Sequence, residues 1–184
     1  HERSEQDPTL MRFQVTCPNC GAVGEETMCE AKIPHFKDCI IMSFLCDRCG
    51  FRNSEIKAGG AVPTRGLVAT LLVVDASDLS RDLLKSDTAG LAIPDVELEL
   101  ARGTLGGLYT SVEGAIGKIR AQLAENPFAA GDSATDDKRA KFDAFLSELK
   151  ALETGQRFPF TLVLTDPLAN SFIGPRRRDR GGGD

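Results

Sequence analysis

CPNCG (17–21) and CDRCG (46–50) repeat one pattern, in which two cysteines separated by two residues are followed by glycine. That spacing lets one tight turn, here called a knuckle, direct both sulfurs to a single point, and two knuckles provide four thiolates for a tetrahedral Zn²⁺ ion. Four thiolates leave no coordination position for water or substrate, so the expected zinc is structural rather than catalytic. The alternative interpretation is that the six cysteines are free thiols in the core of a cytosolic protein. It explains the two paired knuckles less well. We therefore expect one Zn²⁺ ion, bound by Cys17, Cys20, Cys46 and Cys49.

The segments around the second knuckle predict β-strands. FKDCIIMSFL (36–45) is rich in β-branched and aromatic residues, and it would pair with TMCEAKI (27–33) in a long hairpin. FRNSEIK (51–57) is expected to add a third strand. Together these segments predict a zinc ribbon over residues 14–60, preceded by a flexible lead-in at residues 1–13.

Two cysteines and a histidine lie near these strands without belonging to a knuckle. Cys29 and Cys39 fall within the strands, and we interpret them as small buried or half-buried residues rather than ligands. His35 is interpreted as a packed or hydrogen-bonded residue, because the expected zinc already has four sulfur ligands.

A second, β-rich domain is expected over residues 61–175, after the glycine pair at 59–60. LVATLLVVD (67–75) and FPFTLVLT (158–165) are nearly continuous apolar runs, typical of strands that are covered on both faces. For LSRDLLKSDT (79–88), periodicity leaves strand and helix both open.

IPDVELEL (93–100) predicts a strand with one apolar and one acidic face, because the two residue types alternate. The acidic residues are Asp95, Glu97 and Glu99. We weigh two roles for them, a solvated outer face and an acidic docking surface.

A helical hairpin is expected at about residues 110–154. Thr110 and Glu113 have the spacing of a capping box, and apolar residues then recur at helical spacing. A second helix is expected up to Gly155, and both apolar stripes would lie on the sheet. The tail at residues 176–184 is basic and then glycine-rich, which predicts disorder. The fold class is therefore mainly β with a helical hairpin, that is, α+β.

Composition narrows the range of functions. The formal net charge of −5 argues against a general nucleic-acid binder, which normally carries a basic excess. With two histidines, one tyrosine and no tryptophan, the chain is poorly equipped for the commonest metal catalysis and for base stacking. A run of about eighteen apolar residues, as a membrane span needs, is missing. Cysteines in knuckle spacing favour a reducing compartment, the cytosol, the nucleus or both.

Taken together, these stretches resemble the ZPR-type zinc finger family of eukaryotes. The resemblance covers nearly everything from Val15 to Ile173. The matching segments are CPNC (17–20), IPHFKDCIIMSFLCDRCGFRNSEIKAGGAVP (33–63), LSRDLLKSDT (79–88), IPDVELEL (93–100), GTLGG (103–107), TSVEG (110–114) and PFTLVLTDPLANSFI (159–173).

The resemblance implies both fold and function. Full-length members carry two modules, each a zinc ribbon followed by a β-rich domain, and this chain has one module that looks most like the second. Residues 61–175 would then form a double-stranded β-helix. Family members bind translation elongation factor 1-alpha and act as its folding chaperone. They also bind the cytoplasmic domain of a receptor tyrosine kinase and occur in cytoplasm and nucleus. After Ile173 the family continues with an acidic stretch, whereas GPRRRDRGGGD (174–184) stands here.

Three classes of function remain to be compared. The first is a protein-interaction module without catalysis, which is a chaperone or adaptor for elongation factor 1-alpha. The second is a nucleic-acid-binding zinc ribbon of the transcription or translation machinery. The third is an enzyme built on the β-rich domain, and the missing catalytic motifs count against it. For the first class, the expected contacts combine aromatic, cationic and acidic side chains. They are His35, Phe36, Lys37, Arg48, Arg52, Asp95, Glu97 and Glu99.

Overall fold

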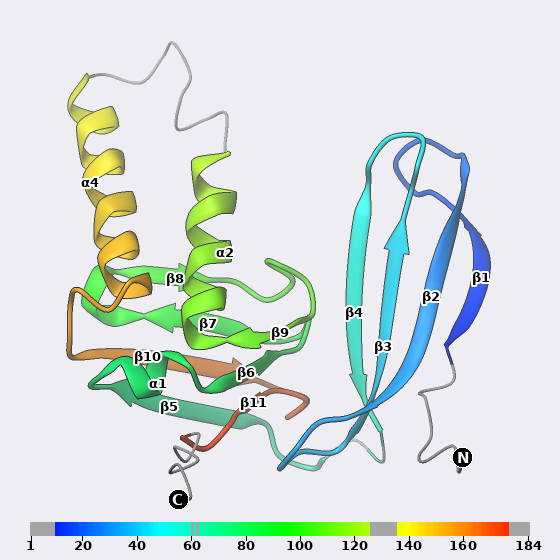
Figure 1. Cartoon of the computed structure of the whole chain (residues 1–184), viewed down its shortest axis with the longest axis horizontal. Coiled ribbons are helices and arrows are strands. Elements are labelled where there is room, and N and C mark those ends of the chain that lie inside the picture. The colour runs from blue at the N-terminus through cyan, green and yellow to red at the C-terminus, as the bar shows by residue number, and fades with distance from the viewer. Residues whose placement is uncertain (1–9, 60, 62, 126–135, 177–184) are drawn as a thin grey trace, which may run out of the picture.

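The computed structural model describes residues 10–59, 61, 63–125 and 136–176, which form two parts standing side by side (Figure 1). The first part, the ribbon (residues 10–59), is an antiparallel sheet with the strand order β1-β2-β3-β4. Its strands are β1 (Met11–Thr16), β2 (Val23–Lys32), β3 (Asp38–Leu45) and β4 (Arg52–Ala58). The knuckles are the β1–β2 and β3–β4 connections, so both lie at one end of the ribbon, and the β2–β3 turn lies at the other.

The expected flexible lead-in is wrong for Met11, Arg12 and Phe13, which belong to β1. Met11 pairs with Met28 and Phe13 with Glu26 in β2. The physical reason is a period-two pattern in MRFQVT, which is long enough for a strand but separated from the other strand signals by the first knuckle. Residues 1–9 lie outside the described residues.

The second part, the β-domain (residues 63–176), contains two sheets. The first has the order β5-β10-β7-β8 and the second the order β11-β6-β9. The strands of the first sheet are β5 (Leu67–Val73), β10 (Phe160–Asp166), β7 (Gly90–Ile93) and β8 (Leu98–Leu100). Those of the second are β11 (Phe172–Ile173), β6 (Asp82–Lys85) and β9 (Leu108–Ser111). Leu83, Ile93 and Leu162 are fully buried in the core of this domain. The predicted mainly β fold is confirmed, and within LSRDLLKSDT the strand is β6.

IPDVELEL does not form the single strand that its alternation predicts. Residues Pro94–Val96 form a short 3₁₀-helix (η1), Glu97 has a left-handed backbone with φ 54°, and the strand β8 begins only at Leu98. The alternation of buried and exposed residues is present, but the acidic side chains do not follow one strand. The turn is held because Asp95 Oδ2 accepts a hydrogen bond from the Thr161 backbone N–H at 2.6 Å.

The two long helices are α2 (Val112–Ala124) and α4 (Asp136–Glu153), and a one-turn helix, α1 (Ala76–Leu79), follows β5. Ser111 rather than Thr110 caps α2, since its Oγ accepts from the Gly114 N–H at 3.1 Å. The hairpin does not lie along a sheet but stands on it, as Figure 1 shows. Among the described residues of the hairpin, the fully buried ones lie toward its base and include Ile116 and Ile119 of α2 and Leu149 and Leu152 of α4. Further from the base, Leu123 of α2 and Phe145 of α4 are partly buried and pack against the core cluster.

A separate apolar cluster, with side chains from both parts, joins the ribbon to the β-domain. Cys39 and Ile56 of the ribbon are buried together with Leu84 of β6. Phe36, in the β2–β3 turn, stacks on Phe172 of β11 with ring centroids 5.3 Å apart. The two parts are therefore joined by a core-like contact as well as by the chain.

The loop GTLGG (103–107) forms a second contact between the two parts. Gly107 donates its N–H to the Ser54 carbonyl of β4 at 3.1 Å. A β-carbon at Gly107 would lie 2.8 Å from the Ile56 nitrogen, so the close approach requires glycine. The buried Lys85 side chain holds the same loop, because its Nζ donates to the Thr104 carbonyl at 2.8 Å. Within the described residues, no helix is long and apolar enough to cross a membrane.

Candidate metal centre

The two knuckles have the same local structure, which explains why the same five-residue pattern recurs. Gly21 N–H donates to the Cys17 carbonyl at 2.9 Å, and Gly50 N–H donates to the Cys46 carbonyl at 2.8 Å. Both glycines have positive φ, 71° and 72°, a conformation that strains any residue with a β-carbon. Each knuckle therefore closes a tight turn with its first cysteine at the end of a strand.

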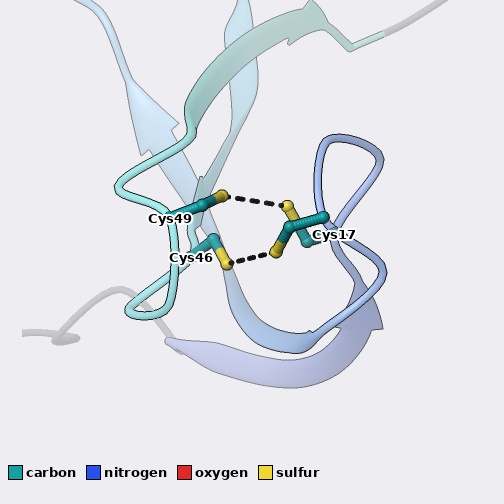
Figure 2. Close-up of side chains that lie close together, drawn as sticks. Cys17, Cys46 and Cys49 are labelled. Carbon is teal, nitrogen blue, oxygen red and sulfur yellow. Dashed lines mark hydrogen bonds between the residues drawn. The ribbon is translucent and has the colours of Figure 1, made fainter.

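The four knuckle sulfurs gather at one point, and Figure 2 labels Cys17, Cys46 and Cys49 of this cluster. All of them lie within 4.8 Å of one another. Cys17 Sγ is 3.7 Å from Cys49 Sγ, and Cys20 Sγ is 3.6 Å from Cys46 Sγ. Sulfurs at about 2.3 Å from a tetrahedral Zn²⁺ ion would be roughly 3.8 Å apart. The spacing of the cluster thus fits a tetrahedral zinc site with one sulfur from each cysteine.

The thiols of this cluster differ in acidity. A hydrogen bond from Asn19 Nδ2, followed in importance by one from the Phe51 backbone, lowers the pKa of Cys49 to about 6. The backbone hydrogen bond at Ala22 acts to lower the pKa of Cys20, but burial and the three neighbouring thiols raise it to about 12. Negative charge on one sulfur therefore opposes charge on another. A bound divalent cation would stabilise all four thiolates together.

A small apolar cluster supports the site from within the ribbon. Cys17 and Cys46 are buried beside Phe44 of β3, and Phe51 packs against the same cluster. Cys49 is exposed, so the sulfurs are enclosed on one side only. Because the apolar side chains here are few, a bound metal would contribute strongly to the stability of this end of the ribbon.

Cys29 and Cys39 lie outside the four-sulfur cluster. Cys39 is fully buried in the contact between ribbon and β-domain, and its Sγ is 3.3 Å from the Lys37 carbonyl. Burial raises the pKa of the Cys39 thiol, with a further contribution from Asp38. Cys29 is half-buried in β2.

The eight residues expected to contact a partner are not brought together. His35, Phe36 and Lys37 lie in the β2–β3 turn, whereas Arg48 lies in the second knuckle at the opposite end of the ribbon. Phe36 is not a free docking residue, because it stacks on Phe172. His35, Arg48 and Arg52 are exposed.

The acidic candidates form a separate group on the β-domain. Asp95 is exposed, but its carboxylate accepts a hydrogen bond from the Thr161 N–H. Glu97 lies between η1 and β8, whereas Glu99 is in β8. A single acidic stripe is therefore absent from this part of the described structure, because η1 interrupts the strand.

A cleft between the two parts is a feature that the sequence analysis missed. It has a volume of about 700 Å³ and lies between β4 of the ribbon and α2 of the β-domain. Arg52 lines one wall and Lys118 the other, with Gly106 of the GTLGG loop at the cleft as well. No sequence signal pairs these positions, because Lys118 belongs to the polar face of α2 and lines the same cleft as Arg52 only where the two parts dock.

Comparison with known proteins agrees with this architecture, a four-cysteine zinc ribbon followed by a jelly-roll domain. Residues 9–64 match the ZPR1 zinc-finger domain and residues 77–182 match the ZPR1 jelly-roll domain. The chain belongs to the ZPR1 family, as the sequence resemblance predicted. The zinc-finger match and the four-cysteine cluster together indicate zinc binding.

Several named relatives match most of the chain. The zinc finger chaperone zpr1 of Schizosaccharomyces pombe is 45% identical over 171 residues, which cover 92% of this chain and 37% of the relative. Zinc finger protein ZPR1 of Mus musculus is 38% identical over 175 residues, covering 94% of this chain and 38% of the relative. An uncharacterized ZPR1-like protein of Methanocaldococcus jannaschii is 26% identical over 164 residues, covering 87% of this chain and 79% of the relative. The chain thus spans well under half the length of these two eukaryotic relatives.

Proposed function

We propose that this chain is a zinc-dependent protein-interaction module, which acts as a chaperone or adaptor for translation elongation factor 1-alpha and catalyses no reaction. The observation that carries the proposal is the four-sulfur cluster at the end of a ribbon that is itself docked on the β-domain. Four cysteine ligands close the coordination sphere, so the metal would hold a binding surface in shape rather than activate a substrate. The relative named a zinc finger chaperone supports this class of function.

The metal content is part of the proposal. We assign one Zn²⁺ ion to Cys17, Cys20, Cys46 and Cys49, because their sulfurs have the mutual spacing that one tetrahedral ion requires. Cys29 and Cys39 are assigned no role in metal binding.

The cleft between the ribbon and α2 is a second element of the proposal. A partner that enters it would meet Arg52 from one part and Lys118 from the other, with Glu125 after the end of α2 as the one acidic residue among the lining residues. Both cationic side chains are exposed, and neither takes part in an ion pair within the described residues. Unpaired cations on facing walls favour an acidic surface of the partner, and they accelerate association more than they strengthen it.

Titration calorimetry with purified elongation factor 1-alpha tests this proposal. The variant that combines Arg52→Glu and Lys118→Glu should bind about tenfold more weakly than the wild-type chain. The matched control reverses the same number of charges at the exposed Arg102 and Lys150, away from the cleft, and should bind like wild type. The affinity of the Arg48→Glu variant shows separately whether the second knuckle contacts the partner.

Two results would count against the proposal. Equal affinity of the wild type and the folded cleft variant would remove the cleft as the contact. Failure of the wild type to bind elongation factor 1-alpha, together with steeply salt-dependent binding of tRNA, would favour the nucleic-acid alternative instead.

The family resemblance motivates two further proposals, a receptor tyrosine kinase domain as a second partner and residence in both cytoplasm and nucleus. Titration with a purified kinase domain and imaging of a fluorescently tagged chain before and after growth stimulation test them. Signal confined to one compartment under both conditions would contradict the second proposal.

A further inference from the structure

All three methionines of the chain lie in one row across the ribbon. Met11 of β1 pairs with Met28 of β2, and Met28 pairs with Met42 of β3. Residues directly opposite each other in an antiparallel sheet project from the same face. The row is therefore a continuous methionine stripe on one face of the sheet.

This face is turned away from the β-domain. The neighbouring row consists of Cys29, Ile41 and Ile56, which project from the opposite face because side chains alternate along each strand. Ile41 and Ile56 belong to the apolar cluster that packs on Leu84 of the β-domain. Among the residues that the structure describes, the β-domain therefore packs on the face opposite the methionine row.

Further apolar side chains extend the stripe. Met11 is 43% exposed, Phe13 is 44% exposed and Ile40 is 39% exposed. Phe13 and Ile40 share the face with the methionines, since they occupy alternate positions of the same strands. We call the surface made by Met11, Phe13, Met28, Ile40 and Met42 the Met face. Part of it is hollowed, with a volume of about 260 Å³ lined by Met11, Met28, Ile40 and neighbouring residues.

The charges on the Met face are unbalanced. Glu26 lies opposite Phe13, and Glu30 lies opposite Ile40. Neither carboxylate forms an ion pair within the described residues, whereas Glu55, further along the same face, is paired with Lys57 at 3.3 Å. A partner that covers the apolar stripe must therefore bring positive charge to Glu26 and Glu30, or it will bury unpaired carboxylates at a cost.

We propose that the Met face binds an extended polypeptide segment in which apolar side chains alternate with lysine or arginine. Methionine is flexible and polarizable, so a methionine surface adapts to apolar side chains of different shape. The two free glutamates select for basic residues. The inference deepens the proposed chaperone function, on which it rests, by naming the chemistry of the segment that the module holds and a surface distinct from the cleft.

Fluorescence anisotropy with two labelled synthetic peptides tests the inference on the full chain. One peptide alternates leucine with lysine, and the other alternates leucine with glutamate. The wild-type chain should bind the lysine peptide and should bind the glutamate peptide at least about tenfold more weakly. The variant Met11→Thr with Met28→Thr, which keeps residues suited to strands, should lose about tenfold in affinity for the lysine peptide.

A matched control and a charge variant complete the experiment. Val68→Thr with Leu72→Thr removes two apolar side chains that are even more exposed than Met11, 67% and 56%, from β5 of the β-domain and should leave binding unchanged. Glu26→Lys with Glu30→Lys should reverse the preference between the two peptides. Zinc content and circular dichroism establish that each variant is folded, and the charge variant tests the inference even if the methionine variant does not fold.

The inference is overturned if the two peptides bind equally, if the β5 control weakens binding as much as the methionine variant, or if the charge variant keeps the wild-type preference. These outcomes are separable from failure of the proposed function, which is measured by titration with intact elongation factor 1-alpha. A chain that binds the factor but ignores both peptides would retain the proposed function and lose this inference.

Discussion

At the scale of single residues, the knuckle cysteines are the part of the chain for which the sequence is most informative. A sulfur site needs four ligands in two close pairs, and the pairs are visible as CPNC and CDRC without any knowledge of the fold. The supporting shell could not be predicted in the same way. Asn19 donates a hydrogen bond to Cys49, which is 30 positions away in the sequence. Phe44 packs beside the site from β3, where the sequence does not distinguish it from the other apolar residues of the strand.

Cys46→Ser should abolish zinc binding and unfold the knuckle end of the ribbon, because metal binding supplies much of the folding free energy of such a small site. Elemental analysis and circular dichroism measure the two effects. Cys29→Ser is the matched control, since Cys29 is half-buried in β2 and outside the cluster, and it should retain one zinc per chain. Loss of zinc from the control, or retention by Cys46→Ser, would contradict the ligand assignment.

Asp166 is a residue whose role only the structure reveals. It is fully buried, and its two carboxylate oxygens accept from the hydroxyls of Ser86, Thr88 and Ser171 and from two backbone N–H groups. Burial alone would raise the pKa of Asp166, but the hydrogen bonds from Ser171, Thr88 and Ser86 outweigh it and hold the pKa below its ordinary value. The charged form is thus the one that the fold prefers.

The lowered pKa of Asp166 predicts a loss of stability in acid. Its contribution is fully present above the ordinary carboxyl pKa of the unfolded chain, and it is lost as the pH falls through the lower pKa of the folded chain. Asp166→Asn should lower the free energy of unfolding by about 2 kcal/mol at neutral pH, because it leaves the buried donors poorly matched. Urea titrations at neutral and acidic pH measure both effects. The gap between wild type and variant should narrow in acid, and a gap that widens would contradict the assignment.

At the scale of elements, period-two and period-3.6 patterns located the strands and helices but not their relation to each other. The apolar stripe on α4 predicts burial along the whole helix, yet Leu149 is fully buried whereas Leu146, one turn nearer the tip, is only half-buried. The pattern cannot distinguish a helix that lies on a sheet from one that packs on a second helix. The strand predicted over IPDVELEL does not form for a related reason. A tertiary hydrogen bond to Asp95 overrides the local alternation of apolar and acidic residues.

The upright hairpin predicts unequal costs for truncation along α4. Leu149→Ala should destabilise the chain by about 3 kcal/mol, since it opens a cavity in the closed core at the base of the hairpin. Leu146→Ala should cost roughly 1 kcal/mol, because that side chain is only partly buried. Thermal unfolding of both variants measures the difference. Equal costs would mean that the upper part of the hairpin is buried as deeply as its base.

At the scale of the whole molecule, the glycines of GTLGG are recognisable in sequence as a turn, but the reason for Gly107 is not. It allows the loop to reach β4, where Gly107 donates to the Ser54 carbonyl, and this contact fixes the ribbon against the β-domain. The partner of the loop lies some fifty positions away in another domain, so no local pattern could predict it.

Gly107→Ala should weaken the contact between ribbon and β-domain while each retains its own fold, because the new methyl group would lie 2.8 Å from the Ile56 nitrogen. Hydrogen exchange at the Gly107 and Ile56 amides should become faster. Thr104→Ala changes the same loop without adding an atom at the contact and should exchange like the wild type. If both amides exchange at the wild-type rate in the Gly107 variant, the ribbon and the β-domain adjust to the new methyl group without losing their contact.

The cleft has one wall in each part of the molecule, and this has a thermodynamic consequence. An occupant that touches both Arg52 and Lys118 favours the docked arrangement of the ribbon and the β-domain. Linkage is reciprocal. If bound zinc raises the affinity for the partner by some factor, the bound partner raises the affinity for zinc by the same factor. At equilibrium, a chelator would then remove zinc from the free chain at a lower concentration than from the complex, and occupancy of the metal site would depend on whether a partner is bound.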